Sequence, residues 1–218
     1  MDNRIYSKIY RWLFIGLLIT FGVAYLTLLG VVNNANIARL IFSTGGYWII
    51  AIIEVILAIY LSARIFKMNS STAKTVYLVY CALTGLTFSS LFIVFEVASI
   101  IYVFLVTAII LGAFSYIGNN IKMDLSKFGT YLLMALLGII ILEIVNIFLG
   151  NNALDMVTCV VALFVFMFYI SYDIQKVKRL AAMGLEEDNL AIMGAFQLYL
   201  DFINIFIRLL QIFGNRRD

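Results

Sequence analysis

The sequence predicts an all-α integral membrane protein with seven transmembrane helices, the last of them central. The chain of 218 residues is 64% hydrophobic and has a mean hydropathy of +1.06. Charged residues make up 12%, about half the share in soluble domains. The apolar residues fall into seven runs, each close to the ~20 residues that cross a bilayer. Lipid must therefore cover most of this apolar surface.

The runs follow one another with short connections. The first follows a basic segment, MDNRIYSKIYRW, but it is long enough to span and six runs follow, so we expect an uncleaved helix. Two connections are very short: the segment GNNA at 150–153 and the single residue Glu96. Both predict tight helical hairpins. We expect one seven-helix domain over residues 1–218. The predicted spans are Arg11–Val32, Tyr47–Phe66, Lys74–Phe95, Val97–Gly118, Lys127–Leu149, Ala153–Ile174 and Leu190–Phe213.

Lysine and arginine predict the orientation. Eleven lie in the N-terminal tail and in the connections 64–74, 119–127 and 175–189, all on one side. The other side carries Arg39, Arg208, Arg216 and Arg217. The positive-inside rule then places the N-terminus in the cytoplasm, and seven crossings place the C-terminus outside. The terminal NRRD conflicts with this and would suit an even number of crossings with a re-entrant last segment.

Composition also argues against several classes of site. The chain has no histidine, and its two cysteines, Cys81 and Cys159, lack C-x-x-C spacing, so we expect buried thiols, no metal site and no cofactor. The net charge of +3 is small and predicts no nucleic-acid partner. No phosphate-binding glycine loop or Ser/His arrangement is present, so we expect no enzyme. The acids Glu186–Asp188 are predicted to lie in a solvated loop.

The last run carries a polar stripe. At about 100° per residue its polar and small residues fall within an arc of roughly 80°, and such a stripe should face protein, not lipid. Arg208 could instead snorkel outward. The stripe consists of Gly194, Gln197, Asp201, Asn204 and Arg208.

Two aspartates are predicted to meet in the cytoplasmic half of the last two helices. Asp173 ends the sixth run, and Asp201 lies roughly 16 Å into the seventh. Such a pair can hold one proton between them, and losing it creates a like-charge contact of about 4 kcal/mol at 4 Å and effective dielectric 20. That approaches the ~5.5 kcal/mol that inverts a two-state equilibrium from 1:99 to 99:1. Arg64 could pair with the bared carboxylate, or serve only as a membrane anchor.

Further polar residues lie toward the outer ends of the runs. Glu54 on the second run and Glu143 on the fifth could line an outer vestibule, with Asn146 on the same face as Glu143. Asn204 extends the stripe of the last run. Each of these groups, like the two aspartates, could instead serve only in structural hydrogen bonds between helices. Asp173 could also be a solvated helix end.

The segments LYLDFINIFIRLLQIFG (198–214) and YISYDIQKVKR (169–179) resemble the Bax inhibitor-1 family, also called the transmembrane Bax inhibitor motif family. The resemblance covers essentially the whole chain. It implies a central last helix, a pH-sensitive calcium leak, and a latch formed by Asp173 and Asp201 with Arg64 as its partner. The AIYLSARIF context of Arg64 departs from the family pattern. By this resemblance the short chain implies a prokaryotic plasma membrane, with the endoplasmic reticulum as the alternative location.

The leading hypothesis is therefore a pH-sensitive cation leak channel in the lipid bilayer, with Ca²⁺ as the permeating ion and protons as its regulator. The alternative is a non-conducting regulatory membrane protein that modulates a membrane-bound protease or a stress response. An intramembrane aspartyl protease is disfavoured, because Tyr199 and Leu200 precede Asp201 where the GxGD signature has small residues. The sequence predicts no oligomeric state.

Overall fold

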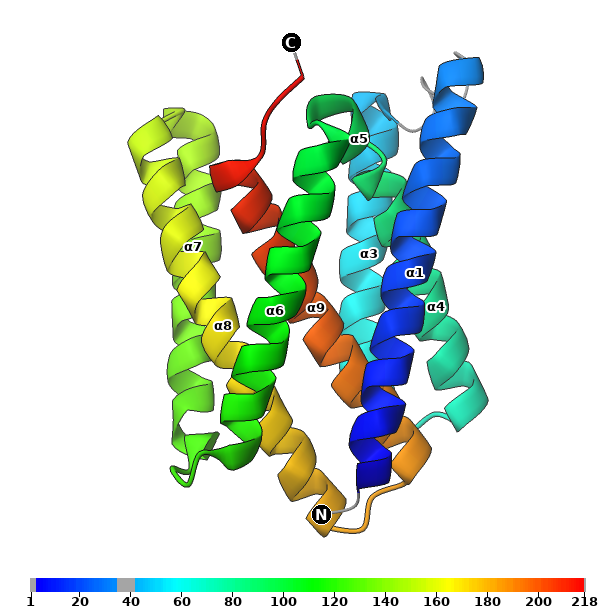
Figure 1. The fold of residues 1–218 in the computed structure, drawn as a ribbon, viewed down its shortest axis with the longest axis vertical. Helices are drawn as coiled ribbons and strands as arrows, with labels where there is room; N and C mark the ends of the chain where they lie inside the picture. Colours follow the sequence, from blue (N-terminus) through cyan, green and yellow to red (C-terminus); the bar gives the residue numbers. More distant parts are fainter. Residues whose placement is uncertain (1–2, 35–41, 218) are drawn as a thin grey trace. The chain divides into compact units, whose positions relative to one another are not determined.

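The computed structural model describes residues 3–34 and 42–217, and within them helices account for every regular element (Figure 1). Six of these helices are long and apolar enough to cross a membrane, and α3 adds a further 21 residues of apolar sequence. The predicted all-α integral membrane class is confirmed. The elements are α1 (Asn3–Asn33), α3 (Thr44–Arg64), α4 (Ser70–Phe88), α5 (Leu91–Val94), α6 (Val97–Asn120), η1 (Leu125–Lys127), α7 (Phe128–Leu149), α8 (Asn152–Ala182) and α9 (Glu187–Phe213).

Several helices extend beyond the predicted apolar runs. Helix α8 continues past Ile174 because the following residues, QKVKRLAA, are mostly strong helix formers. It ends before Gly184, whose positive φ of 75° gives a left-handed residue after the helix. The predicted loop of 175–189 is therefore wrong in extent, and the connection covers only 183–186. Arg39, which was counted for the orientation, lies outside the described residues.

The third predicted span is interrupted near its C-terminal end. The helix begins at Ser70, where the side chain of Asn69 accepts a hydrogen bond from the Thr72 amide at 2.7 Å. It breaks at Ser89 and Ser90, whose hydroxyls donate to the carbonyls of Leu86 and Thr87 at 2.6 and 2.7 Å. Such local side-chain bonds compete with the helical ladder, which explains the separate short helix α5.

Packing divides the chain into two compact units. The first unit comprises Met1–Val97, Gly184–Phe196 and Arg216–Asp218. Within it, α1 and α3 both pack on α4. The buried Tyr77 of α4 donates to the Trp12 carbonyl at 3.0 Å, and its ring meets Phe196 of α9 edge-on. The first part of α9 is thus part of this unit.

An ion-pair cluster secures the beginning of α9 in the first unit. Asp188 accepts hydrogen bonds from Lys8 at 3.0 Å and Lys74 at 2.8 Å, and Lys8 also pairs with Glu187. Asn189 donates to the Met68 carbonyl at 2.9 Å. The prediction of a solvated segment at 186–188 agrees with the exposed side chains, but Glu187 and Asp188 belong to α9 and not to a loop, and they fix this helix to α1 and α4.

The two ends of α9 contact opposite ends of the α4–α5 segment. Asp188 meets Lys74 near the beginning of α4, whereas the tail beyond α9 pairs with residues that end α5. There the Arg217 amide donates to the Val94 carbonyl at 2.9 Å, and Arg216 forms an isolated bridge with Phe95. The beginning of α9 and the tail beyond it therefore contact opposite ends of the α4–α5 segment, which favours a seventh crossing over a re-entrant segment.

The second unit comprises Ala98–Met183 and Gln197–Asn215. Helix α7 packs on α8, and α6 approaches α8 so closely at Gly118 that an added Cβ would lie 2.6 Å from the Ser171 Cα. The side chain of Gln175 on α8 fixes the α6–α7 connection, because it accepts from the Leu125 amide and donates to the Met123 carbonyl.

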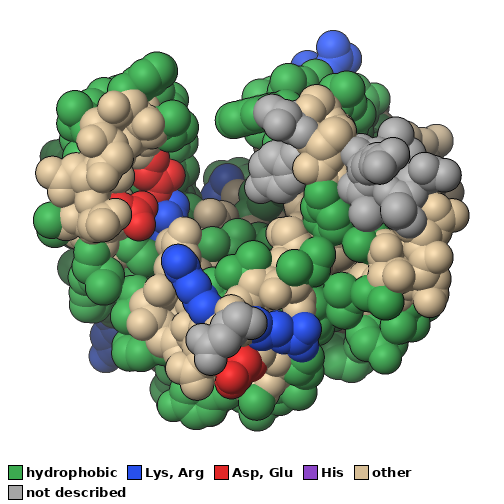
Figure 2. Space-filling view, turned by 90° about the horizontal axis from the view of Figure 1, so that it is seen from above, with side chains coloured by type: hydrophobic (Ala, Val, Ile, Leu, Met, Phe, Trp, Pro, Cys, Tyr) green, Lys and Arg blue, Asp and Glu red, His purple; other side chains and the backbone are tan. Residues whose placement is uncertain are grey.

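Burial along the helices agrees with a central last helix. In its most apolar stretch of 18 residues, α9 is 78% buried, against 39% or less for the other five candidate spans. The remaining helices expose large apolar side chains, and hydrophobic groups cover much of the face in Figure 2. Exposed apolar surface on this scale is what a bilayer covers.

Candidate functional site

Helices α8 and α9 bring Asp173 and Asp201 into the core of the second unit. Their exposed fractions are 5% and 4%, and the two carboxyl groups lie within electrostatic reach of each other. Tyr169, one turn before Asp173 on α8, lies within the same reach of both. Acidic side chains are seldom this buried, because a lone carboxylate loses its hydration. Both acids are therefore buried, and their role as a proton latch stays a prediction.

The site contains buried hydrogen-bond acceptors without a donor. Among the described residues, no group donates to Oδ2 of Asp201 or to Oε1 of Gln197, one turn earlier on the same helix. Elsewhere in the second unit, the buried hydroxyl of Ser115 on α6 likewise has no partner among the described residues. An unsatisfied buried acceptor costs about 1–3 kcal/mol. A carboxyl proton or a water molecule is the kind of donor that would satisfy these oxygens.

The polar stripe of α9 lies on the more open side of that helix. Gln197, Asn204 and Arg208 are partly exposed, whereas Phe202 and Phe206 on the other sides are 1% and 0% exposed. The prediction that the stripe faces protein therefore holds for Gly194 and Asp201, which are buried, and for Arg208, which contacts α7. Gln197 and Asn204 are partly exposed. Polar groups in a membrane helix favour contact with water or protein over lipid, which agrees with the position of these residues.

Arg208 does not snorkel outward but pairs with Glu143 of α7. Its side chain is 14% exposed and that of Glu143 is 33% exposed. Arg208 also donates to Gln211 at 3.4 Å, and the Cys159 thiol donates to the same Gln211 oxygen at 3.3 Å. This cluster joins α7, α8 and α9 toward the C-terminal end of α9, and it offsets the charge that Glu143 would offer a cation.

The other predicted pathway residues have local roles in the fold. In the first unit, Glu54 accepts a hydrogen bond from Thr87 at 3.3 Å. In the second, Asn146 accepts from the Asn151 amide at 3.0 Å in the α7–α8 turn, and Asn204 donates to the Leu200 carbonyl at 2.8 Å. These bonds explain why the polar side chains are tolerated. Whether Glu54, Glu143, Asn146 and Asn204 line an ion pathway stays a prediction.

Arg64 lies in the last turn of α3, in the first unit, with an exposed side chain. Within the described ranges it forms no ion pair. Its proposed pairing with the two aspartates stays a prediction. The same ranges contain no cluster of three or more Cys, Asp or Glu side chains that could hold a metal ion. Both cysteines are buried.

Comparison with known proteins identifies the family. The family model described as "Inhibitor of apoptosis-promoting Bax1" matches residues 2–218. The chain belongs to the Bax inhibitor-1 family. It is 42% identical to Inner membrane protein YbhL of Escherichia coli K12 over 217 residues, which are 97% of this chain and 91% of that relative. It is 36% identical to Uncharacterized protein RP147 of Rickettsia prowazekii, covering 99% of this chain and 91% of the relative.

Some groups at the site of this family member could not be found from sequence alone. The partner of Arg208 was hidden, since Glu143 lies 65 residues earlier. Tyr169 and Gln197 gave a weak signal, because each lies one helical turn from an aspartate on the same face.

Proposed function

We propose that this member of the Bax inhibitor-1 family is a pH-sensitive cation leak channel with Ca²⁺ as the permeating ion. A proton shared by Asp173 and Asp201 keeps it closed. The observation that supports the proposal most is the burial of both carboxyl groups at 5% and 4% exposure, within electrostatic reach of each other and with an Asp201 oxygen that has no donor among the described residues.

The charge of the pair provides the gate. With one shared proton the two carboxyl groups attract each other through a hydrogen bond. When that proton leaves, two like charges remain in a poorly solvated place, and their repulsion is about 4 kcal/mol at 4 Å and effective dielectric 20. Repulsion of this size separates α8 from α9 at the aspartates. Channel opening therefore increases as pH rises.

The polar side of α9 supports a cation as the permeating ion. A bared aspartate pair attracts cations and repels anions. Gln197 and Asn204 border the aspartate on the more open side of the helix and offer amide oxygens. Ca²⁺ takes six to eight oxygen ligands in tight sites, and far fewer side chains converge here, so the ion passes through a weak transit site.

Flux through purified protein in liposomes tests the proposal. Calcium entry, measured with an enclosed dye, is expected to rise at least roughly tenfold from acidic to mildly alkaline pH, because about 1.4 kcal/mol of repulsion suffices for that change. Asp173→Asn and Asp201→Asn are each expected to abolish the pH dependence. Asp155→Asn is the matched control, because this acid is exposed in the first turn of the same helix α8.

Two outcomes contradict the proposal. Unchanged pH dependence in both aspartate variants removes the latch. No flux at any pH from protein that is folded in the liposomes removes the channel itself. In that second case, co-purification of a membrane-bound protease from native membranes supports the alternative, a non-conducting regulator.

A further inference from the structure

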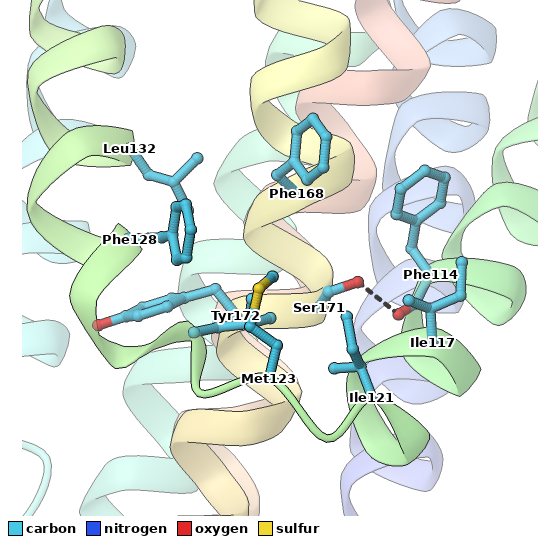
Figure 3. A pocket seen from close by; sticks show the side chains of 10 residues that line it. Phe114, Ile117, Ile121, Met123, Phe128, Leu132, Phe168, Ser171 and Tyr172 are labelled. Atoms are coloured by element: carbon cyan, nitrogen blue, oxygen red, sulfur yellow. Dashed lines mark hydrogen bonds between the residues drawn. The ribbon is translucent and has the colours of Figure 1, made fainter.

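An apolar cavity of about 420 Å³ lies among α6, α7, α8 and the α6–α7 connection, entirely within the second unit. Figure 3 shows Phe114 and Ile117 of α6, Phe128 of α7, and Phe168 and Tyr172 of α8 around a common space, with Met123 of the connection beside it. Cavities of this size are typical of small-molecule and lipid sites.

The cavity is open to the bilayer and offers almost no polar contact. Phe168, Met123 and Ile117 are 58%, 51% and 45% exposed, so its lining is part of the membrane-facing surface. The Ser171 hydroxyl is already used, since it donates to the Phe114 carbonyl at 2.7 Å (Figure 3). Tyr172 carries the only other hydroxyl among the lining residues, so a polar ligand would find few partners there, whereas a hydrocarbon chain would meet apolar side chains from three helices.

Basic residues lie around one end of the cavity, the end lined by the α6–α7 connection. Segments 119–127 and 174–182 together carry five basic residues and one acid, a net charge of 5 − 1 = +4. Arg179 lies over the ring of Tyr172, at 5.9 Å from its centroid, and thus at the edge of the lining. Lys178 donates to the Asn119 carbonyl at 3.2 Å. Two further lysines, Lys122 and Lys127, are exposed and adjoin lining residues in sequence.

The single acid of this region does not cancel its positive charge. Hydrogen bonds from the side chain and the amide of Ser126 hold the pKa of Asp124 below its ordinary value, so it is ionised. Arg179 lies 3.6 Å from this carboxylate and balances it. Four basic side chains are then left without an acidic counterpart in the two segments, at the depth where phospholipid headgroups meet the ends of the helices.

We propose that this cavity binds one acyl chain of an anionic phospholipid, whose phosphate lies against the basic residues of segments 119–127 and 174–182. The bilayer leaflet that meets this end of the helices supplies the lipid. The apolar lining favours the acyl chain, and the surplus of positive charge favours the anionic headgroup. Binding therefore depends on both the acyl chain and the headgroup of the same phospholipid.

Quenching by brominated lipids tests the site. In a Trp12→Phe, Trp48→Phe background, Phe168→Trp places an indole at the cavity, and Phe164→Trp places one on the same helix, also exposed but outside the lining. The full chain is reconstituted in vesicles of unbrominated phosphatidylcholine with a small fraction of brominated phosphatidylglycerol or brominated phosphatidylcholine. We expect brominated phosphatidylglycerol to quench the indole at 168 more strongly than brominated phosphatidylcholine does. The association constant derived from quenching should be about fivefold or more higher for phosphatidylglycerol.

Charge variants separate the cavity from general membrane attraction. A triple variant is expected to reduce the preference for phosphatidylglycerol at position 168 to less than twofold. It combines Lys122→Gln, Lys127→Gln and Arg179→Gln. The control Lys67→Gln, at an exposed lysine of the first unit, should leave this preference unchanged. Equal quenching by both lipids at 168 overturns the proposal. So does an equal preference at 164, which would indicate only an enrichment of anionic lipid around the protein. Neither readout depends on ion flux.

Discussion

Arg208 and Glu143 are opposite charges inside membrane-spanning helices, and each makes the other tolerable. A single charged side chain at the centre of a membrane helix costs about 2.5–3.5 kcal/mol on insertion scales. The pair reduces that cost through a charge-assisted hydrogen bond, and Gln211 satisfies a second guanidinium donor at 3.4 Å. Glu143 is 33% exposed, so solvent screening limits the energy of the pair.

Removing one partner should therefore cost more than removing both. Arg208→Gln or Glu143→Gln alone is expected to lower the free energy of unfolding by about 1–3 kcal/mol, because the remaining charge loses its partner. The double variant should recover part of that loss. Thermal unfolding in detergent gives the four values of the double-mutant cycle. Additive losses would show that the two side chains do not interact in the folded protein.

Sequence reasoning at this scale identified positions better than partners. Asp173, Asp201 and Arg208 were recognised as membrane-embedded because they interrupt apolar runs, and helical periodicity placed Asp201 and Arg208 on one stripe. Periodicity contains no information about a contact between Arg208 and Glu143, which depends on how α7 and α9 pack. The same limit explains the error at Asp188, whose partners Lys8 and Lys74 come from two other helices.

At the level of elements, α6 and α8 meet through backbone, not through long side chains. Gly118 allows this, since its missing Cβ leaves room for the backbone of Ser171. Close approach at a small residue is the usual way in which membrane helices gain packing contacts, because lipid offers no hydrophobic drive between them. The cavity proposed as a lipid site adjoins this contact, and Ser171 belongs to both.

A methyl group at this contact should separate the two helices. Gly118→Ala is expected to destabilise the protein by about 1–3 kcal/mol through overpacking. Gly112→Ala is the matched control on the same helix, because nothing lies within 4 Å of its added Cβ, and it should be neutral or slightly stabilising. Unfolding temperatures in one detergent provide the comparison. Equal effects of the two substitutions would contradict the close approach of α6 to α8.

Element boundaries were less predictable than element number. Seven apolar runs predicted the long helices because bilayer thickness fixes their length. Hydropathy cannot mark where a helix continues into water, so the amphipathic end of α8 beyond Ile174 was missed. The break at Ser89 and Ser90 was missed for a different reason, since both residues are compatible with membrane helices and only their hydroxyl bonds to Leu86 and Thr87 stop the ladder.

For the whole molecule, the direction of α9 decides the topology. Its first residues are held by Lys8 and Lys74, and the tail beyond it is held by Val94 and Phe95. A re-entrant last segment would return the tail to the side of Asp188. The hydrogen bond from the Arg217 amide to the Val94 carbonyl and the bridge between Arg216 and Phe95 hold the tail at the other end. The arginines of the NRRD run are therefore expected on the side that carries few basic residues.

Cysteine labelling can test this topology because Cys81 and Cys159 are buried and give a low background. Met183→Cys reports the α8–α9 connection, where the native side chain is 73% exposed, and Asn215→Cys reports the exposed tail. In intact cells, a membrane-impermeant maleimide is expected to label position 215 but to reach position 183 only after lysis, since the positive-inside rule places the basic connections in the cytoplasm. Labelling of both positions from the same side would indicate an even number of crossings. It would also show that the contacts of Arg216 and Arg217 with α5 do not form in the membrane.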